Sequence, residues 1–446
     1  MILLENGIIV TSEKEEKGTI VIDDGTILDV LYTADEGYTL KVWNYRKEAD
    51  QVIDIEGQHV MAGGIDAHVH FREPGLTHKA DMATESLAAV AGGVTSVMDM
   101  PNTSPATTSA EALKGKLELA KEKSVAKLSF HIGATNSNVE EICHLITKGD
   151  DETGITPDDI AGVKVFMGSS TGNMLVDAND TLDRLFAIKE KPVLVHCEDE
   201  ATIKENLAKA IETYGEDIPF REHENIRSRK ACIKSSIKAL EMAMKHGTRL
   251  VLCHISTKEE IQMTRAAKLT NPDIVAETSC NYLWFCNDDY DRLGSRAKCN
   301  PAVKGADDRQ ALIEALANGD IDTIGSDHAP HLPSEKDAPY CKAPSGLPSI
   351  QQSLPVLLTI AHDNEIPLTR IASVFSENAS KIYKLNRGKI AKGYCADLVV
   401  FDYGQTFEVK TADQFSKCGW TPYEGETLRG AINNVYRDGK EVKLPR

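Results

Sequence analysis

Short apolar runs alternate with helical stretches through most of this chain. Residues 229–246 carry an apolar stripe at spacings of four, three and four, which predicts an amphipathic helix and is formed by Ile233, Ile237, Leu240 and Met244. A second helix is predicted over 307–319, with Asp307 as its N-cap and Gly319 as its stop. Apolar runs of strand length lie between the helical stretches, at residues 60–66, 95–100, 128–133, 163–166, 193–196, 250–254, 274–278 and 323–327. Strands alternating with helices in this number predict an α/β fold, a (β/α)8 barrel of the TIM type, over residues 57–383.

The two ends of the chain are rich in short β-like runs instead. Near the N-terminus these runs are 8–10, 19–22 and 27–30, with a hairpin signal at Asp24-Gly25. Near the C-terminus a strand is predicted over 396–401 and a hairpin over 434–442. The pattern predicts a small β-sandwich domain assembled from residues 1–56 and 384–446. Two separate β extensions are the alternative that the sequence leaves open.

Polar side chains interrupt the predicted barrel strands in one consistent place. Barrel strands are buried on both faces and should be apolar. Several of them nevertheless end in, or contain, a possible metal donor, and these donors are His68, His70, Lys164, His196, His254 and Asp327. All but Lys164 lie at the C-terminal end of their strand, which is the rim where such barrels carry their active sites. The sequence therefore predicts a metal site at this rim.

The spacing of these residues suits metal binding. His68 and His70 are two residues apart on a strand, so both imidazoles point to the same side and can reach one ion. A protonated Lys164 cannot bind a cation, but its neutral amine can react with CO2 to form a carbamate whose two oxygens bridge two metals. Burial near cations favours that neutral amine. Each position alone has an ordinary structural explanation, whereas donors on five strands together favour a metal site.

Composition narrows the class of partner. The 446 residues carry a formal net charge of −18 and only 6% aromatic residues, so the basic footprint of a nucleic-acid-binding or anionic-membrane-binding protein is missing. The ten cysteines include no Cys-x-x-Cys pair, which indicates free thiols in a reducing compartment. The first residues do not resemble a signal peptide and no apolar run has membrane-spanning length. We therefore expect a cytoplasmic protein whose partner is neither a nucleic acid nor an anionic membrane.

Around the possible metal donors, the sequence resembles the dihydroorotases of the amidohydrolase superfamily. The resembling segments follow the predicted strands in order and are 66–75 (DAHVHFREPG), 99–105 (DMPNTSP), 163–167 (VKVFM), 195–199 (VHCED), 253–257 (CHIST), 300–302 (NPA) and 325–331 (GSDHAPH). Segments 388–390, 393–397 and 422–425 resemble the composite β domain of the same family. The resemblance covers essentially the whole chain.

The resemblance implies a role for each matched position. The six donors would hold two zinc ions, bridged by carbamylated Lys164 and by a hydroxide, and Asp327 would also be the catalytic acid–base. Arg72 and Asn102 would bind the substrate carboxylate, with help from His331, and Asn300 would shape the pocket. The planar fork of Arg72 suits a bidentate carboxylate, although a rim ion pair with Glu73 or Asp81 is the structural alternative.

The activity that the resemblance implies is the reversible cyclisation of N-carbamoyl-L-aspartate to L-dihydroorotate in de novo pyrimidine biosynthesis, by a homodimer. Three alternatives stay open: a related cyclic amidohydrolase such as an allantoinase or a dihydropyrimidinase (hydantoinase), a non-catalytic homologue, and a single-metal deaminase. A third metal near His196, Cys253 and Glu277 occurs in some members. Residues 167–174, with two glycines, predict a mobile loop that closes over the substrate.

Overall fold

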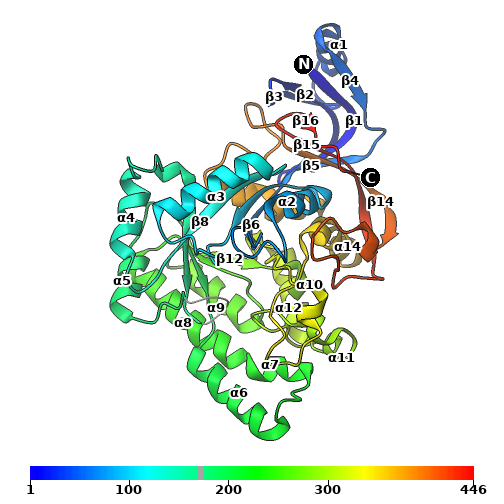
Figure 1. Cartoon of the computed structure of the whole chain (residues 1–446). Helices are drawn as coiled ribbons and strands as arrows, with labels where there is room; N and C mark the ends of the chain where they lie inside the picture. Colours follow the sequence, from blue (N-terminus) through cyan, green and yellow to red (C-terminus); the bar gives the residue numbers. More distant parts are fainter. Residues whose placement is uncertain (169–173, 446) are drawn as a thin grey trace.

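Two β-sheets organise the computed structural model, which describes residues 1–168 and 174–445 (Figure 1). One is a parallel sheet whose strands are hydrogen-bonded to one another in chain order. These strands are β6 (Gly64–Val69), β7 (Val94–Asp99), β8 (Lys127–Gly133), β9 (Ile160–Phe166), β10 (Val193–His196), β11 (Leu250–Leu252), β12 (Val275–Thr278) and β13 (Thr323–Ile324). An isolated parallel bridge between Val69 and His328 connects the two edges of the sheet. The sheet is thus nearly closed, which confirms the predicted (β/α)8 barrel.

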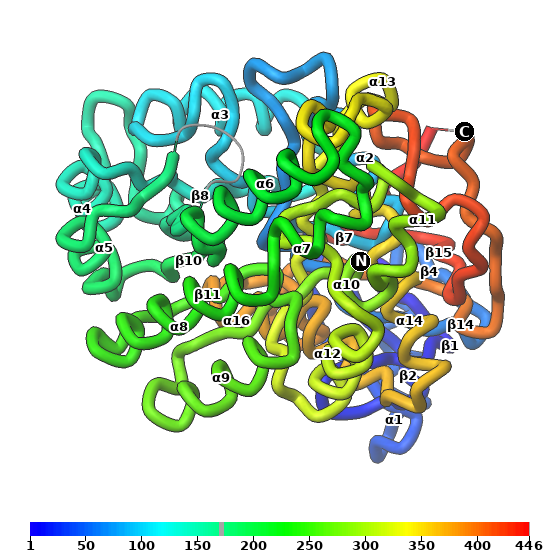
Figure 2. Tube along the Cα trace, turned by 90° about the horizontal axis from the view of Figure 1, so that it is seen from below, coloured from blue at the N-terminus to red at the C-terminus, as the bar shows by residue number. Residues whose placement is uncertain are grey.

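Helices surround the barrel, as the view in Figure 2 shows for α3, α4, α5, α8, α9 and α12. The longer helices are α2 (Met82–Ala91), α3 (Ala110–Lys123), α4 (Val139–Lys148), α5 (Asn179–Phe186), α6 (Glu200–Tyr214), α8 (Arg229–His246), α9 (Lys258–Lys268), α12 (Ala306–Asn318) and α14 (Ser353–Asp363). Shorter ones are α7 (His223–Ile226), α10 (Cys280–Trp284), α11 (Asp289–Leu293), α13 (Pro333–Lys336), α15 (Leu368–Ala372) and α16 (Asn378–Ile382). None of the described helices combines the length and the apolar character needed to cross a bilayer.

Helix caps explain why two helices begin just beyond the barrel rim. Asp199 follows β10 by three residues, accepts a hydrogen bond from the Thr202 backbone N–H at 3.0 Å and begins α6. Thr257 accepts one from the Glu260 backbone N–H at 3.2 Å and begins α9. Such caps satisfy backbone donors that a helix leaves unpaired at its N-terminus. Each cap residue follows its histidine, His196 or His254, by three residues, so the segments between strand and helix are short.

Two helices differ in detail from the prediction. In α8 only Leu240 of the predicted apolar stripe is buried: Ile237 is 42% exposed, and the other buried residues are small, such as Ala239 and Ala243. Small side chains let a helix approach its neighbours closely, so close packing decides which face is buried. The N-cap of α12 is Gly305 rather than Asp307, and the helix ends as predicted at Gly319, which has the left-handed conformation common at this position.

The second sheet joins the two ends of the chain, at the top right of Figure 1. Its strand order is β16-β15-β14-β5-β1-β2-β3, with β4 paired to β1. Their bounds are β1 (Ile2–Val10), β2 (Glu15–Asp23), β3 (Thr26–Tyr32), β4 (Gln51–Asp54), β5 (His59–Ala62), β14 (Leu398–Glu408), β15 (Thr427–Arg437) and β16 (Lys440–Glu441), and α1 (Tyr38–Glu48) lies between β3 and β4. Leu4 and Ile20 from one end share a buried cluster with Leu398 and Val400 from the other. The ends form one composite β domain, as predicted, and not two separate extensions.

The predicted strand 60–66 is wrong as a single strand. β5 pairs with β1 and β14 in the terminal sheet, and β6 begins the barrel at Gly64. A Cβ atom on the intervening Gly63 would lie 2.4 Å from the side chain of Thr95, so the chain crosses between the two sheets where no larger residue fits. The division into a terminal domain (1–56 with 384–446) and a barrel domain (57–383) remains a proposal. Because β5 belongs to the terminal sheet, we place the first boundary at Gly63 instead of residue 57.

Candidate metal centre

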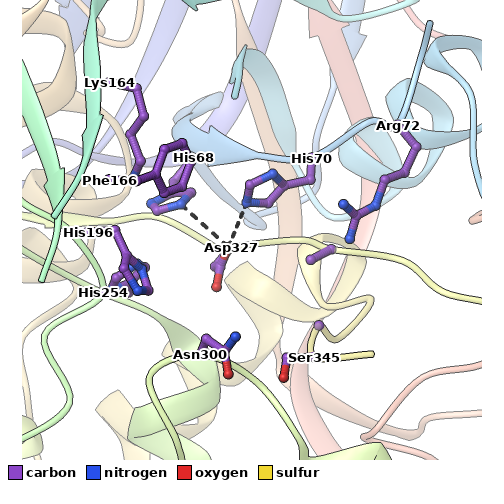
Figure 3. Close-up of a pocket in the computed structure, with 12 residues that line it drawn as sticks. His68, His70, Arg72, Lys164, Phe166, His196, His254, Asn300, Asp327 and Ser345 are labelled. Atoms are coloured by element: carbon purple, nitrogen blue, oxygen red, sulfur yellow. Dashed lines mark hydrogen bonds and ion pairs between the residues drawn. The ribbon is translucent and has the colours of Figure 1, made fainter. Parts of the chain in front are cut away.

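All six predicted metal ligands line one pocket at the C-terminal rim of the barrel (Figure 3). The other residues that line it are Arg72, Phe166, Asn300, Ala329, Ser345 and Gly346. Three rim residues, Arg72, His254 and Asp327, have a positive φ of 65°, 38° and 49°, which non-glycine residues rarely adopt. Strained backbone of this kind persists where the surrounding structure holds it and is frequent at functional sites.

Asp327 is the centre of the first group of donors. Its Oδ1 lies 3.0 Å from His70 Nε2 and 3.4 Å from His68 Nε2, the contacts drawn as dashed lines in Figure 3. The ligand atoms of these three residues lie within 4.8 Å of one another. The predicted His-x-His geometry therefore holds, with both imidazoles directed to the same side.

His196 and His254 form the second group. His196 Nδ1 lies 2.9 Å from His254 Nε2, and both side chains are buried. The other nitrogen of His254, Nδ1, has no hydrogen-bond partner among the described residues. His196 Nε2 lies 3.0 Å from Glu198 Oε2, and Glu198 also pairs with Arg227. A carboxylate at one ring nitrogen favours the tautomer whose other nitrogen is a lone-pair donor, which is how metal-binding histidines are oriented.

Lys164 reaches the pocket from β9 and is fully buried. Its Nζ lies 3.3 Å from Cys253 Sγ, and it forms no ion pair with a carboxylate of the described residues. A buried ammonium without an anionic partner is costly, because its desolvation is not offset. A carbamate of Lys164, which is an anion, would not carry this cost of an unpaired cation.

The protonation states also suit a metal centre. Burial, and then the charge of Lys164, hold the pKa of His68 well below its ordinary value, and burial followed by His196 does the same for the pKa of His254. Burial alone would raise the pKa of Asp327, but the neighbouring His68 and His70 bring it below its ordinary value. Neutral imidazoles and an ionised carboxylate are the forms that bind metals. The chemistry of the donor set and the unpaired His254 Nδ1 fit a centre of one or two divalent ions.

A further group of possible donors lies behind His68. His68, Cys253 and Glu277 have ligand atoms within 4.8 Å of one another, and His68 Nδ1 lies 2.7 Å from Glu277 Oε1. The sequence prediction named His196 in this group, and the structure has His68 in its place. The reason is the tertiary fold: Glu277 on β12 reaches across the barrel to β6, while His196 turns towards His254.

The predicted substrate-binding residues lie beside this centre. Arg72 is 3% exposed, and its guanidinium donates to the Pro330 carbonyl at 3.1 Å and lies 3.0 Å from His331 Nε2. The ion pairs considered as its structural alternative do not form, because Glu73 pairs with Lys123 and Asp81 pairs with Lys417. Burial lowers the pKa of Arg72 to about 10, so it stays charged at neutral pH.

Asn102 and His331 have contacts that the sequence did not predict. Asn102 Oδ1 lies 2.7 Å from His70 Nδ1, so the amide orients a predicted metal ligand, and Asn102 does not itself line the pocket. His331 lies behind Arg72, with Nδ1 3.1 Å from Lys79 Nζ and Nε2 3.1 Å from the Ser345 carbonyl. Asn300 lines the pocket and its Oδ1 has no hydrogen-bond partner among the described residues. Most of the predicted closing loop, residues 169–173, lies outside the described residues.

Sequence reasoning missed a buried ion pair below the pocket. Asp99 pairs with Lys116 of α3, and both are buried. The other carboxylate oxygen of Asp99 accepts the Phe71 backbone N–H at 2.7 Å, next to Arg72. Lys116 resembles any helical surface lysine in the sequence, so only Asp99 in the strand-end motif could have drawn attention to this pair.

Comparison with known proteins assigns the class of this barrel. The profile of the amidohydrolase family matches residues 59–442, so the chain belongs to this family. A dihydroorotase of Methanosarcina mazei is 35% identical over 84% of this chain and 82% of its own length. An allantoinase of Desulfitobacterium hafniense is 30% identical over 100% of this chain and 97% of its own length.

The fold agrees with solved structures of the same class. The L-hydantoinase (dihydropyrimidinase) from Arthrobacter aurescens superposes with a TM-score of 0.89 at 25% identity, over 99% of this chain and 95% of that one. Together with the donor set at the rim, these relatives identify the chain as a metal-dependent cyclic amidohydrolase.

Proposed function

We propose that the chain is a dihydroorotase, which interconverts N-carbamoyl-L-aspartate and L-dihydroorotate in de novo pyrimidine biosynthesis. One observation carries the choice of substrate: the guanidinium of Arg72 is buried at the pocket and has no carboxylate partner among the described residues. A buried, unpaired charge is unfavourable, and a substrate carboxylate would compensate it. Allantoin and dihydrouracil carry no carboxylate and would leave Arg72 uncompensated.

The proposed cofactor is a pair of zinc ions. His68 and His70 would hold one with Asp327, His196 and His254 would hold the other, and Lys164 would join them as a carbamate. The ions would polarise the amide carbonyl and acidify water. Lys164 supports this assignment because it is buried, lines the same pocket as the two histidine groups (Figure 3), and has no carboxylate within ion-pair distance among the described residues.

The protein residues divide the remaining work. Arg72 binds the substrate carboxylate, away from the reacting amide, so that its binding energy orients the substrate. Asn102 supports His70, His331 supports Arg72, and Asn300 forms the opposite wall. Asp327 takes the proton of the attacking water and returns it to the amide nitrogen, and in cyclisation it removes the proton of the carbamoyl nitrogen.

The test is interconversion of dihydroorotate and N-carbamoyl-L-aspartate by zinc-loaded protein, followed by absorbance. Arg72→Ala should lower kcat/KM by about a hundredfold or more, since it removes a charged, bidentate contact. Arg184→Ala is the matched control, because Arg184 is an exposed residue that pairs with Glu140 on the surface. No turnover of dihydroorotate, with hydrolysis of allantoin or dihydrouracil instead, would refute this proposal in favour of the allantoinase or hydantoinase alternative.

We also propose that the protein is a homodimer. Its chain mass is 48.8 kDa, so light scattering on the purified protein should return twice this mass. A value equal to the chain mass would contradict the proposal.

A further inference from the structure

Lys336 is a fully buried lysine close to the pocket that the proposed mechanism does not use. It ends the short helix α13, and its side chain has a relative exposure of 0%. Its ammonium donates to three backbone carbonyls, those of Lys298 at 3.1 Å, Pro344 at 2.9 Å and Gly346 at 3.1 Å. No carboxylate in the described parts of the chain lies within ion-pair distance of it. The ammonium of Lys336 is thus stabilised by peptide carbonyls, with the ring of Trp420 5.9 Å away, and not by an ion pair.

The three carbonyls belong to two segments that form walls of the pocket. Pro344 and Gly346 flank Ser345, and Ser345 and Gly346 both line the pocket. Lys298 precedes Asn300, which lines it from the other segment, and the Gly346 N–H donates to the Lys298 carbonyl at 2.9 Å. Lys336 therefore bonds to both segments. Their pocket-lining residues Asn300 and Ser345 lie next to each other in Figure 3.

The wall held by Lys336 is packed tightly at the Arg72 end of the pocket. The Ser345 carbonyl lies 3.1 Å from His331 Nε2, the nitrogen that also lies 3.0 Å from the Arg72 guanidinium. A Cβ atom on Gly346 would come within 2.5 Å of the Ala329 carbonyl oxygen, so this segment has no room to shift inward. The position of Ser345 is consequently coupled to the position of the arginine.

A second lysine continues the same arrangement. Lys298, itself buried, donates to the carbonyls of Tyr340 and Ala343, each at 2.6 Å. Burial lowers the pKa of Lys336 to about 7 and that of Lys298 to about 8, and neither has a carboxylate at ion-pair distance in the described chain. The two lysines thus hold the wall through hydrogen bonds to backbone carbonyls and not through ion pairs.

We propose that Lys336 is a positioning residue for substrate specificity, which holds the Ser345–Gly346 and Asn300 walls so that the Arg72 end of the pocket fits a carboxylate. The inference rests on the proposed function and deepens it. Lys336 does not line the pocket and bonds to none of the predicted metal ligands. Its loss therefore weakens binding of the anionic substrate while the reacting centre keeps its composition.

The experiment measures dihydroorotate binding by calorimetry and steady-state kinetics for wild-type protein, Lys336→Met and Lys336→Gln, all zinc-loaded. Lys336→Met keeps the approximate length of the side chain without donors or charge, and should raise Kd and KM at least tenfold while kcat falls less than threefold. Lys336→Gln keeps a hydrogen-bond donor, so its Kd and KM should lie between those of the wild type and of Lys336→Met. Lys304→Met is the control, because Lys304 is also buried but donates to Ala302 and does not line the pocket.

The outcomes separate the two proposals. Unchanged Kd and KM in Lys336→Met, with only a lower melting temperature, would assign Lys336 a purely structural role and overturn the inference alone. An equal loss in Lys304→Met would also overturn it. If Lys336→Met does not fold, unchanged binding by Lys336→Gln decides against the inference and weakened binding decides for it. Failure of the wild-type protein to bind dihydroorotate at all would refute the proposed function, and the inference with it.

Discussion

Asn102 Oδ1 lies 2.7 Å from His70 Nδ1, so a residue expected at the substrate instead contacts a predicted metal ligand. Because the amide oxygen only accepts hydrogen bonds, the proton of His70 must lie on Nδ1. This leaves the lone pair of Nε2, which faces Asp327, for a metal. Asn102 thus selects the tautomer of His70.

Removing this contact should weaken metal binding. We expect Asn102→Leu to lower zinc affinity about 10- to 100-fold, because the partners that orient a metal-binding histidine typically contribute that much. The measurement is competition for zinc with a calibrated chelator. Asn136→Leu is the control, since its side chain bonds to Asp177 on the surface. Equal zinc affinity in wild type and Asn102→Leu would contradict the assignment.

The proposed acid–base role of Asp327 can be tested separately from its proposed role as a metal ligand. Asp327→Asn should lower kcat about 10²- to 10⁴-fold, the usual contribution of a general acid–base, while the protein keeps its metal through the remaining ligands. Elemental analysis beside the kinetic assay tests both statements, and Asp307→Asn on the surface is the control. Near-normal turnover, or loss of the metal together with the activity, would argue against the proton-transfer role.

The buried pair of Asp99 and Lys116 should be important for stability. Lys116→Met leaves Asp99 buried without its cation, which typically costs about 3–5 kcal/mol of unfolding free energy. Lys209→Met, which breaks an exposed pair with Glu205, should cost about 1 kcal/mol or less. Urea unfolding followed by circular dichroism compares the two. A similar loss of unfolding free energy in both variants would show that burial of the pair does not contribute to stability.

The burial of His131 should make the stability of the protein depend on pH. Burial lowers its pKa from 6.5 to about 3 in the folded protein. Between pH 6.5 and about pH 3, His131 is therefore protonated in the unfolded chain but not in the folded protein. The contribution of His131 to the free energy of unfolding is complete above pH 6.5 and is lost as the pH falls towards 3. The loss should be on the order of a few kcal/mol.

Comparison with His131→Gln isolates this contribution, since the other histidines titrate in both proteins. We expect the unfolding free energy of the wild type to fall more steeply than that of the variant as the pH decreases from 6.5. The Ala67 carbonyl, which lies 2.9 Å from His131 Nε2, remains available to the glutamine. Parallel curves would mean that His131 is already protonated, or exposed, in the folded protein.

The sequence predicted the barrel, and the meeting of the polar donors at its rim, for a physical reason. Strands buried on both faces are apolar, so a polar residue such as His196 or Asp327 at a strand end stands out. Strand limits were less certain where two strands follow directly, as at β5 and β6, because apolar periodicity does not reveal which sheet a strand joins. The same limitation applies to α8, where small residues rather than Ile237 are buried.

The sequence by itself determined the fold class, the β-rich character of both chain ends and the set of donors at the barrel rim, because these follow from local patterns and motif order. That the two ends join in one sheet was decided only by the tertiary structure. Only the tertiary structure decided that Asn102 holds His70, that Glu277 bonds to His68 across 209 positions of chain, and that Lys116 and Lys336 are buried. Lysine is normally exposed, and hydrogen bonds between distant segments depend on how those segments pack. Such partners have no local pattern that a sequence could display.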